Sequence, residues 1–272
     1  MNQQHSTRAA RRPKKVYRGA LHYLWGEWIR PIGEAVIIAL IVTTFLFTTV
    51  GIQGSSDVPV VQDGERVFVP KYETWLHRLG VGSFKRGELV VLKPPVGAPQ
   101  SERPVPFVGN FFPNLTYRPY FIKRIIGVPG DKVRMVRGVV YLNGKKLDES
   151  HTVPYWQKQK TYGNSNAWDN WSNLASTSEW PYDSWPEALR ASVQGSGNAA
   201  ELVVPAGHFF VMGANRSVGG SEDSRVFGPV RADEIAGRAT FVWWPPVTRA
   251  EDGSIKLNWR LLPRPPGFQN LQ

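Results

Sequence analysis

Residues 35–52 read AVIIALIVTTFLFTTVGI, eighteen consecutive residues without a charged side chain. As a helix, this stretch would extend about 27 Å, close to the hydrocarbon thickness of a bilayer. Trp25, Trp28 and Arg30 precede it, and such amphipathic side chains favour the membrane–water interface. We therefore predict one transmembrane helix over residues 31–52. The competing interpretations are a cleaved signal peptide, which no convincing A-x-A site supports, and a buried core helix.

The segment before this helix is strongly basic. Residues 1–30 contain seven Lys or Arg and one acid, Glu27, so six of the eleven net positive charges of the chain lie there. A basic tail beside an apolar run determines topology and contacts anionic lipid, so we expect a lipid bilayer and no nucleic acid as partner. The positive-inside rule places this tail in the cytoplasm. Residues 53–272 are then an extracytoplasmic domain on the cytoplasmic (inner) membrane.

Beyond residue 52 the pattern changes to short β-type runs separated by Gly and Pro. It predicts a mainly β fold, an antiparallel β-rich domain with a Trp-rich inserted cap subdomain over residues 148–200. Short helices are expected near Glu73–Leu79 and Pro186–Ser192. The predicted strands are Arg66–Val69, Glu88–Leu92, Phe121–Ile126, Lys132–Val136, Val139–Leu142, His208–Met212 and Ala239–Trp243.

Composition excludes several kinds of site. The chain has no cysteine, which rules out a thiol nucleophile, a disulfide framework and a Cys-bearing zinc site. The five histidines show no metal-ligand spacing, and no phosphate-binding glycine loop occurs. We therefore expect neither a metal nor a cofactor. A Ser–His–Asp triad that uses His208 is an open alternative for the chemistry.

A serine and a lysine are the candidate reactive residues. Ser56 closes the Gly-Ser-Ser sequence that directly follows the apolar run. Lys123 lies within FIKRIIGVPGD, residues 121–131. If its side chain points inward among Phe and Ile, desolvation disfavours the ammonium form, and a neutral amine can accept a serine proton. The alternative is a lysine on a solvated strand face beside Arg124.

A third element, GANRSVGGSEDSRVFG, occupies residues 213–228. Clusters of Gly, Asn, Ser, Asp and Arg are ordinarily turns with local side-chain caps. This cluster also offers a hydroxyl that could orient a base, and an Asp–Arg pair that could rigidify the loop.

Together these elements resemble the sequence boxes of bacterial type I signal peptidase, in the same order and with similar spacing. GSSDVPVV from Gly54 is similar to the serine box, and RGELVVLKPP from Arg86 is similar to the hydrophobic strand that follows it. FIKRIIGVPGD resembles the lysine box, and the cluster from Gly213 resembles the last box. The resemblance covers roughly residues 30–145 and 205–240. The four boxes in combination are specific, whereas any one of them is not.

The resemblance implies a membrane-bound serine endopeptidase that cleaves N-terminal signal peptides from exported preproteins with a Ser/Lys dyad. Ser56 would be the nucleophile and Lys123 the general base. Ser221 would orient the lysine amine. Asp223 and Arg225 would form a structural ion pair behind the site.

The resemblance also implies how the substrate is held. The main-chain amide of Ser56 would bind the oxyanion. Some members add a hydroxyl two positions earlier, where this chain has Gly54. Ile52, Phe121 and Ile122 would form shallow pockets for small side chains, as A-x-A cleavage sites require.

The chain departs from the family pattern in several places: Pro59-Val60-Val61 replaces the usual PTL, two extra residues precede Ser221, and two departures change a charge. Asp57 stands where the family has Met, and Ala214 stands where it has Asp. A carboxylate about 6 Å from Lys123 would favour the ammonium by roughly 3 kcal/mol at an effective dielectric near 20. Activity would then fall or shift to high pH, unless Asp57 points to solvent. The alternative function is therefore a catalytically degenerate, signal-peptidase-like protein that binds signal peptides or scaffolds a membrane complex.

Overall fold

The computed structural model describes most of the chain outside the N-terminal tail and the greater part of the Trp-rich segment. The chain divides into two compact units, Met1–Thr44 and Phe45–Gln272. The described residues are 19–98, 100–106, 114–136, 139–152, 155, 185–195, 199–216, 220–249, 253–269 and 271.

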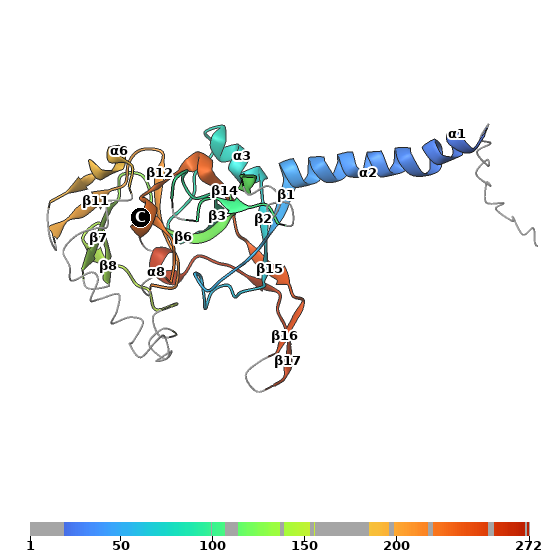
Figure 1. The fold of residues 1–272 in the computed structure, drawn as a ribbon. Coiled ribbons are helices and arrows are strands. Elements are labelled where there is room, and N and C mark those ends of the chain that lie inside the picture. The colour runs from blue at the N-terminus through green and yellow to red at the C-terminus, as the bar shows by residue number, and fades with distance from the viewer. Residues whose placement is uncertain are drawn as a thin grey trace, which may run out of the picture. The chain divides into compact units, whose positions relative to one another are not determined.

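A long helix makes up most of the described part of the first unit and ends two residues past its boundary, at Leu46 (Figure 1). From His22 to Leu46 this helix is long and apolar enough to cross a membrane, and none of its most apolar stretch is buried. Exposed apolar side chains over such a length favour a nonpolar environment such as the interior of a bilayer. The helix is built from α1 (Ala20–Leu24), η1 (Trp25–Ile29), α2 (Arg30–Ile41) and η2 (Val42–Leu46).

The position of this helix corrects the predicted span of residues 31–52. The helix begins at Ala20 and ends at Leu46, and the last part of the apolar run is strand β1 (Phe47–Gly51). Three β-branched residues lie within β1, and such side chains favour a strand. All five β1 residues pair antiparallel with β2 (Arg66–Pro70), which satisfies backbone groups along one edge. Apolarity alone did not distinguish the helical part of the run from the strand.

Three sheets form most of the second unit (Figure 1). Their strand orders are β1-β2-β15-β18, β10-β11-β7-β8-β9 and β13-β12-β6-β3-β14, and two hairpins, β4-β5 and β16-β17, lie outside them. Every strand pairing in the described residues is antiparallel. The remaining strands are β3 (Leu89–Leu92), β4 (Arg103–Pro104), β5 (Thr116–Tyr117), β6 (Phe121–Gly127), β7 (Lys132–Val136), β8 (Val139–Leu142), β9 (Lys145–Lys146), β10 (Val193–Gln194), β11 (Glu201–Val203), β12 (His208–Met212), β13 (Val230–Arg231), β14 (Ile235–Arg238), β15 (Phe241–Trp244), β16 (Val247–Arg249), β17 (Ile255–Leu257) and β18 (Arg260–Leu261).

The predicted mainly β, antiparallel class is confirmed, and every predicted strand occurs with its ends shifted by at most two residues. Most of the predicted cap, residues 148–200, lies outside the described residues. At its described end, Trp185 is 2% exposed and packs in a hydrophobic core. The short helices of this unit are α3 (Tyr72–Arg78), α6 (Glu187–Arg190), α7 (Ser224–Phe227), η5 (Ala232–Glu234) and α8 (Pro266–Gln269).

Strand β6 carries the lysine motif through the middle of the third sheet. It pairs with β3 along one edge and with β12 along the other. Ile122, Ile125 and Ile126 each belong to a different hydrophobic cluster, so both faces of the strand are covered. Lys123 is consequently only 2% exposed. The alternative of a lysine on a solvated strand face is wrong.

Candidate active site

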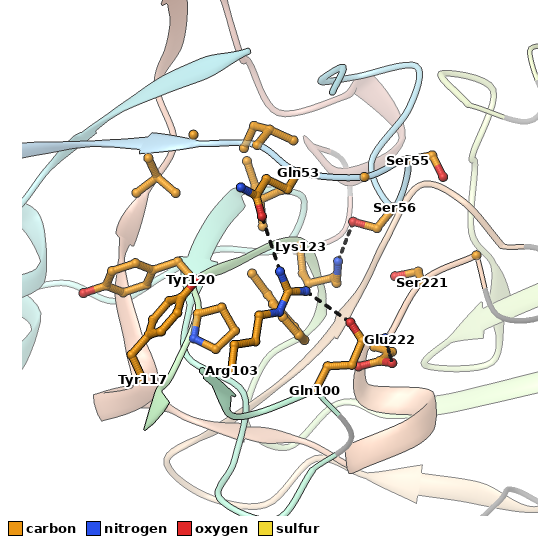
Figure 2. Close-up of a pocket in the computed structure, with 18 of the residues that line it drawn as sticks. Gln53, Ser55, Ser56, Gln100, Arg103, Tyr117, Tyr120, Lys123, Ser221 and Glu222 are labelled. Atoms are coloured by element: carbon orange, nitrogen blue, oxygen red, sulfur yellow. Dashed lines mark hydrogen bonds between the residues drawn. The ribbon is translucent and has the colours of Figure 1, made fainter. Parts of the chain in front are cut away.

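Ser56 and Lys123 meet although 67 residues separate them in the sequence. Ser56 lies in the turn that follows β1, and Lys123 projects from β6. The Lys123 Nζ donates a hydrogen bond of 2.8 Å to the Ser56 Oγ. Figure 2 shows these two side chains pointing toward one another, whereas Ser55 points away from the lysine. A hydroxyl in hydrogen-bond contact with a desolvated amine is the geometry that nucleophile activation requires.

The turn at residues 213–216 fixes the backbone of Ser56. The Asn215 N–H donates a hydrogen bond of 2.9 Å to the Ser56 carbonyl oxygen. Within the turn, the Arg216 Nε donates to the Gly213 carbonyl oxygen at 2.8 Å. The predicted third element therefore does contribute to the site, and it does so through its backbone as well as its side chains.

Asp223 and Arg225 form the predicted ion pair beneath this turn. The guanidinium donates to both carboxylate oxygens at 2.8 Å, and the Gly213 N–H donates to Asp223 at 2.9 Å. Burial by itself raises the pKa of the Asp223 carboxyl. The charge and hydrogen bonds of Arg225, with the Gly213 N–H, outweigh burial and hold this pKa below its ordinary value. Asp223 is thus a carboxylate at neutral pH.

Ser221 reaches the same groove as Lys123. It is 7% exposed, and its Oγ makes no hydrogen bond with any of the described residues. The role of Ser221 in orienting the lysine amine stays a prediction, which the shared location supports.

Asp57 points into the site and not to solvent. Its Oδ2 lies 3.7 Å from the Lys123 Nζ, and the exposures of the two side chains are 1% and 3%. The Ser56 Oγ lies 3.4 Å from the same oxygen, and the Ala214 N–H donates to the other oxygen at 3.3 Å. Burial raises the pKa of the Asp57 carboxyl, although Lys123 and Arg124 oppose this rise.

A second layer of buried charge lies behind the dyad. Arg124 donates to the Gly87 carbonyl oxygen at 2.6 Å, and burial lowers its pKa to about 10. Arg216 pairs with Glu149, with one contact at 3.2 Å. Burial, aided by Arg124 and Arg216, lowers the pKa of His151 to about 3, so this imidazole is neutral. Sequence reasoning missed Glu149 and His151, because both lie in a segment without a recognisable pattern.

A groove of about 470 Å³ opens over Ser56 and Lys123. The predicted pocket residues Ile52, Phe121 and Ile122 all line it. They are apolar and come from the two elements that carry the dyad, as shallow pockets beside the reacting groups would require.

Four polar side chains that the sequence did not single out cross this groove. Arg103 donates to the side-chain oxygens of Gln53 at 3.3 Å and Gln100 at 3.1 Å, and Gln100 donates to Glu222 at 2.6 Å. Figure 2 shows them in a row from one wall to the other. Only Glu222 had a signal, because it lies between Ser221 and Asp223 in the last box.

The histidine alternative receives no support. His208 begins β12, where its Nδ1 lies 2.9 Å from the Ala206 carbonyl oxygen, and it does not line the groove. In the part of the chain that the structure describes, no group of three or more His, Asp or Glu could hold a metal ion.

Gly213 is the glycine on which the site geometry depends most closely. A Cβ at this position would lie 2.5 Å from the Ser56 carbonyl oxygen and 2.7 Å from the Ser221 Cβ. We expect Gly213→Ala to reduce kcat by about a hundredfold or more, because sub-ångström displacement of a nucleophile is costly. The measurement is kcat for cleavage of a precursor in detergent.

Gly33→Ala is the matched control, since its added Cβ meets nothing within 4 Å and alanine favours a helix. A Gly213→Ala variant with kcat equal to that of Gly33→Ala would contradict the proposed closeness of the turn to Ser56.

A buried lysine amine in contact with a serine hydroxyl, in a β-rich unit, is the arrangement expected of a serine hydrolase with a lysine base. Residues 25–244 match the family described as signal peptidase, peptidase S26. The chain therefore belongs to the signal peptidase I family, peptidase S26.

Individual relatives agree with this assignment. The chain is 32% identical to signal peptidase I of Bacillus licheniformis over 80% of its own length and 88% of the relative. It is also 32% identical to signal peptidase IB of Staphylococcus aureus, over 80% of this chain and 89% of that one. A crystal structure of a signal peptidase I from Enterococcus faecalis aligns with a TM-score of 0.34 at 22% identity, over 58% of this chain and 98% of that chain. The relationship rests on the sequence matches, because so low a TM-score carries no argument.

Proposed function

We propose that this signal peptidase cleaves signal peptides with Ser56 as nucleophile and Lys123 as general base. The observation that carries the proposal is the 2.8 Å hydrogen bond between the Lys123 Nζ and the Ser56 Oγ at a lysine that is 2% exposed. Family membership identifies a signal peptidase, and its preprotein substrates and the residue roles are the proposed part.

In the acylation step, the neutral Lys123 amine takes the Ser56 hydroxyl proton while the Oγ attacks the carbonyl carbon of the scissile bond. The carbonyl electron pair moves to oxygen and forms a tetrahedral oxyanion. When this intermediate collapses, the C–N bond breaks, and Lys123 returns the proton to the leaving amine. The products are the free N-terminus of the mature protein and an ester between the signal peptide and Ser56.

In the deacylation step, Lys123 takes a proton from a water molecule that attacks the ester carbon. The C–O bond to Ser56 breaks, the Oγ regains its proton, and the signal peptide leaves with a new carboxylate. No group outside the chain and water is needed for the atoms and charges to balance.

The oxyanion is held by the main-chain N–H of Ser56, which donates no hydrogen bond to other described residues. A backbone donor aimed at the developing charge is worth about 3 kcal/mol in comparable sites. Gly54 provides no hydroxyl to add to it. The Ile52, Phe121 and Ile122 side chains accept small residues of the substrate beside the scissile bond.

Three further residues support the dyad in this proposal. Ser221 orients the Lys123 amine when substrate displaces the present contacts. The buried Asp223–Arg225 pair holds the 213–216 turn, which in turn holds the Ser56 carbonyl.

The helix that ends at Leu46 is proposed as the membrane anchor. The basic residues before it place the N-terminus in the cytoplasm and the unit from Phe45 onward outside the cytoplasmic membrane. The substrates are signal-peptide-bearing preproteins, which reach the enzyme in the same bilayer.

The test is cleavage of a preprotein with an A-x-A site by the purified full chain in detergent, across pH 6 to 10, with the cut located by mass spectrometry. Cleavage is expected after the second alanine. Replacing that alanine by Phe in the substrate should slow cleavage by about a hundredfold or more, because the shallow pocket has no room for it.

Replacing the middle residue of the site by Phe is the matched control and should be tolerated. Binding without cleavage at every pH, by folded protein, would refute the proposal in favour of a non-catalytic binder of signal peptides.

A further inference from the structure

Asp57 is a buried acid in direct contact with the proposed dyad. Its Oδ2 lies 3.7 Å from the Lys123 Nζ and 3.4 Å from the Ser56 Oγ, so all three groups meet at one point. The carboxyl is 1% exposed, so water cannot separate it from the amine. A carboxyl in this position influences every proton movement on the lysine.

The carboxyl is also held in place from behind. Its Oδ1 accepts the Ala214 N–H at 3.3 Å, and the adjacent Asn215 N–H binds the Ser56 carbonyl oxygen at 2.9 Å. One turn therefore fixes both the nucleophile and the acid next to it. Ala214 is 5% exposed and its methyl group brings no charge of its own.

The other charged groups around Asp57 already have partners. Arg124 on β6 acts electrostatically on Asp57 and donates to the Gly87 carbonyl oxygen. Asp223, which precedes α7, also acts electrostatically on Asp57 and is paired with Arg225. Among the described residues, Asp57 is the one carboxyl within 4 Å of the Lys123 amine. Glu222, which also interacts electrostatically with Lys123, accepts a hydrogen bond from Gln100.

We propose that Asp57 is a positioning residue that shares one proton with Lys123, holds the amine against Ser56, and sets the pH at which the base becomes available. The proposal deepens the Ser56–Lys123 mechanism and rests on it. It gives the Asp57 departure from the family pattern a function, where the sequence suggested only damage.

The proton count of the pair explains the expected behaviour. With two protons, the carboxyl is neutral, the amine is an ammonium, and no base is available. With one proton, the pair is either carboxylate with ammonium or neutral carboxyl with neutral amine, and the second form can accept the Ser56 proton. In the proposed pair both one-proton forms are populated: burial, which raises the pKa of the Asp57 carboxyl, supports the neutral form, and the carboxylate–ammonium form withholds the amine as a base. With no proton, the amine is again free to act.

The test is the pH profile of kcat/KM for the full chain in detergent, since this profile reports the ionisation of groups in the free enzyme. In Asp57→Asn, the ammonium loses its anionic partner, and a buried amine without a partner gives up its proton more readily. The acidic limb of the profile is therefore expected to move to lower pH by about one unit or more, a relative gain of about tenfold well below the wild-type midpoint and of no more than about twofold at the midpoint.

Two variants control this measurement. Asp57→Glu keeps the negative charge and is expected to keep the limb near its wild-type position. Asp63→Asn removes another carboxylate of the same loop, which accepts the Gly54 N–H at 2.8 Å, and is expected to leave the limb unmoved. A uniform loss of kcat/KM in Asp57→Asn with an unmoved limb would reduce Asp57 to a structural role and overturn the proposal.

A measurement on wild-type protein covers the case in which Asp57→Asn does not fold. Carbon-13 NMR of labelled aspartate carboxyls should show one carboxyl that titrates together with the acidic limb of cleavage. Titration of every aspartate carboxyl well below that limb would overturn the proposal. These outcomes are distinct from failure of the dyad mechanism, which predicts no cleavage by the wild-type chain at any pH.

Discussion

Ser56→Ala is expected to abolish detectable cleavage, with a fall in kcat of at least about ten-thousand-fold. Loss of the Oγ removes the atom that forms the ester, and no other hydroxyl accepts a hydrogen bond from Lys123 in the described residues. Residual activity would come only from direct attack of water on the bound substrate, with the oxyanion stabilised by backbone donors. The measurement is single-turnover cleavage of a preprotein, with mass spectrometry of the enzyme to detect the acyl-ester in the wild type.

Ser55→Ala is the matched control. Ser55 precedes the nucleophile, but Figure 2 shows its side chain directed away from Lys123. We expect Ser55→Ala to retain most of the wild-type rate. If Ser55→Ala lost activity and Ser56→Ala kept it, the nucleophile would be Ser55, and the assignment of Ser56 would be wrong.

Lys123→Met is expected to lower kcat by at least about a thousandfold at every pH, because the serine then lacks a base. The methionine fills much of the buried space that the Lys123 side chain occupies on β6, so the fold should survive. Lys123→Arg provides a sharper comparison. The guanidinium keeps a positive charge beside Asp57 but cannot release its proton at working pH.

Both Lys123 variants should therefore be inactive if the amine acts as a base. Substantial activity in Lys123→Arg would show that position 123 needs only a charge, and would contradict the general-base role. Lys132→Met, an exposed lysine on β7, is the control for loss of a positive charge and should cleave at the wild-type rate.

Sequence reasoning predicted the parts of the site that lie on regular strands. The Phe-Ile-Lys-Arg-Ile-Ile pattern placed Lys123 on a strand and left its burial open, and the structure confirms that strand as β6 and buries the lysine. The resemblance of residues 213–228 to the last family box implied that Asp223 and Arg225 form an ion pair, and the structure contains this pair.

Features that depend on tertiary contacts were not predictable. The sequence left the direction of the Asp57 side chain open, since only the 213–216 turn from a distant part of the chain fixes it. Arg103 and Gln100 reach the groove from an irregular segment whose Pro-rich sequence has no period. The end of the helix at Leu46 was missed because a continuous apolar run suits a helix in lipid and an edge strand equally well.

The junction at Leu46 and Phe47 determines where the β-rich unit can be separated from its proposed membrane anchor. Strand β1 starts one residue after the helix, and it supplies both a sheet edge and part of the groove wall. A soluble fragment that starts at Phe47 keeps this strand and the pairing with β2. A fragment that starts at residue 53, as apolarity alone would suggest, lacks β1. It therefore lacks part of the groove wall as well as the apolar helix.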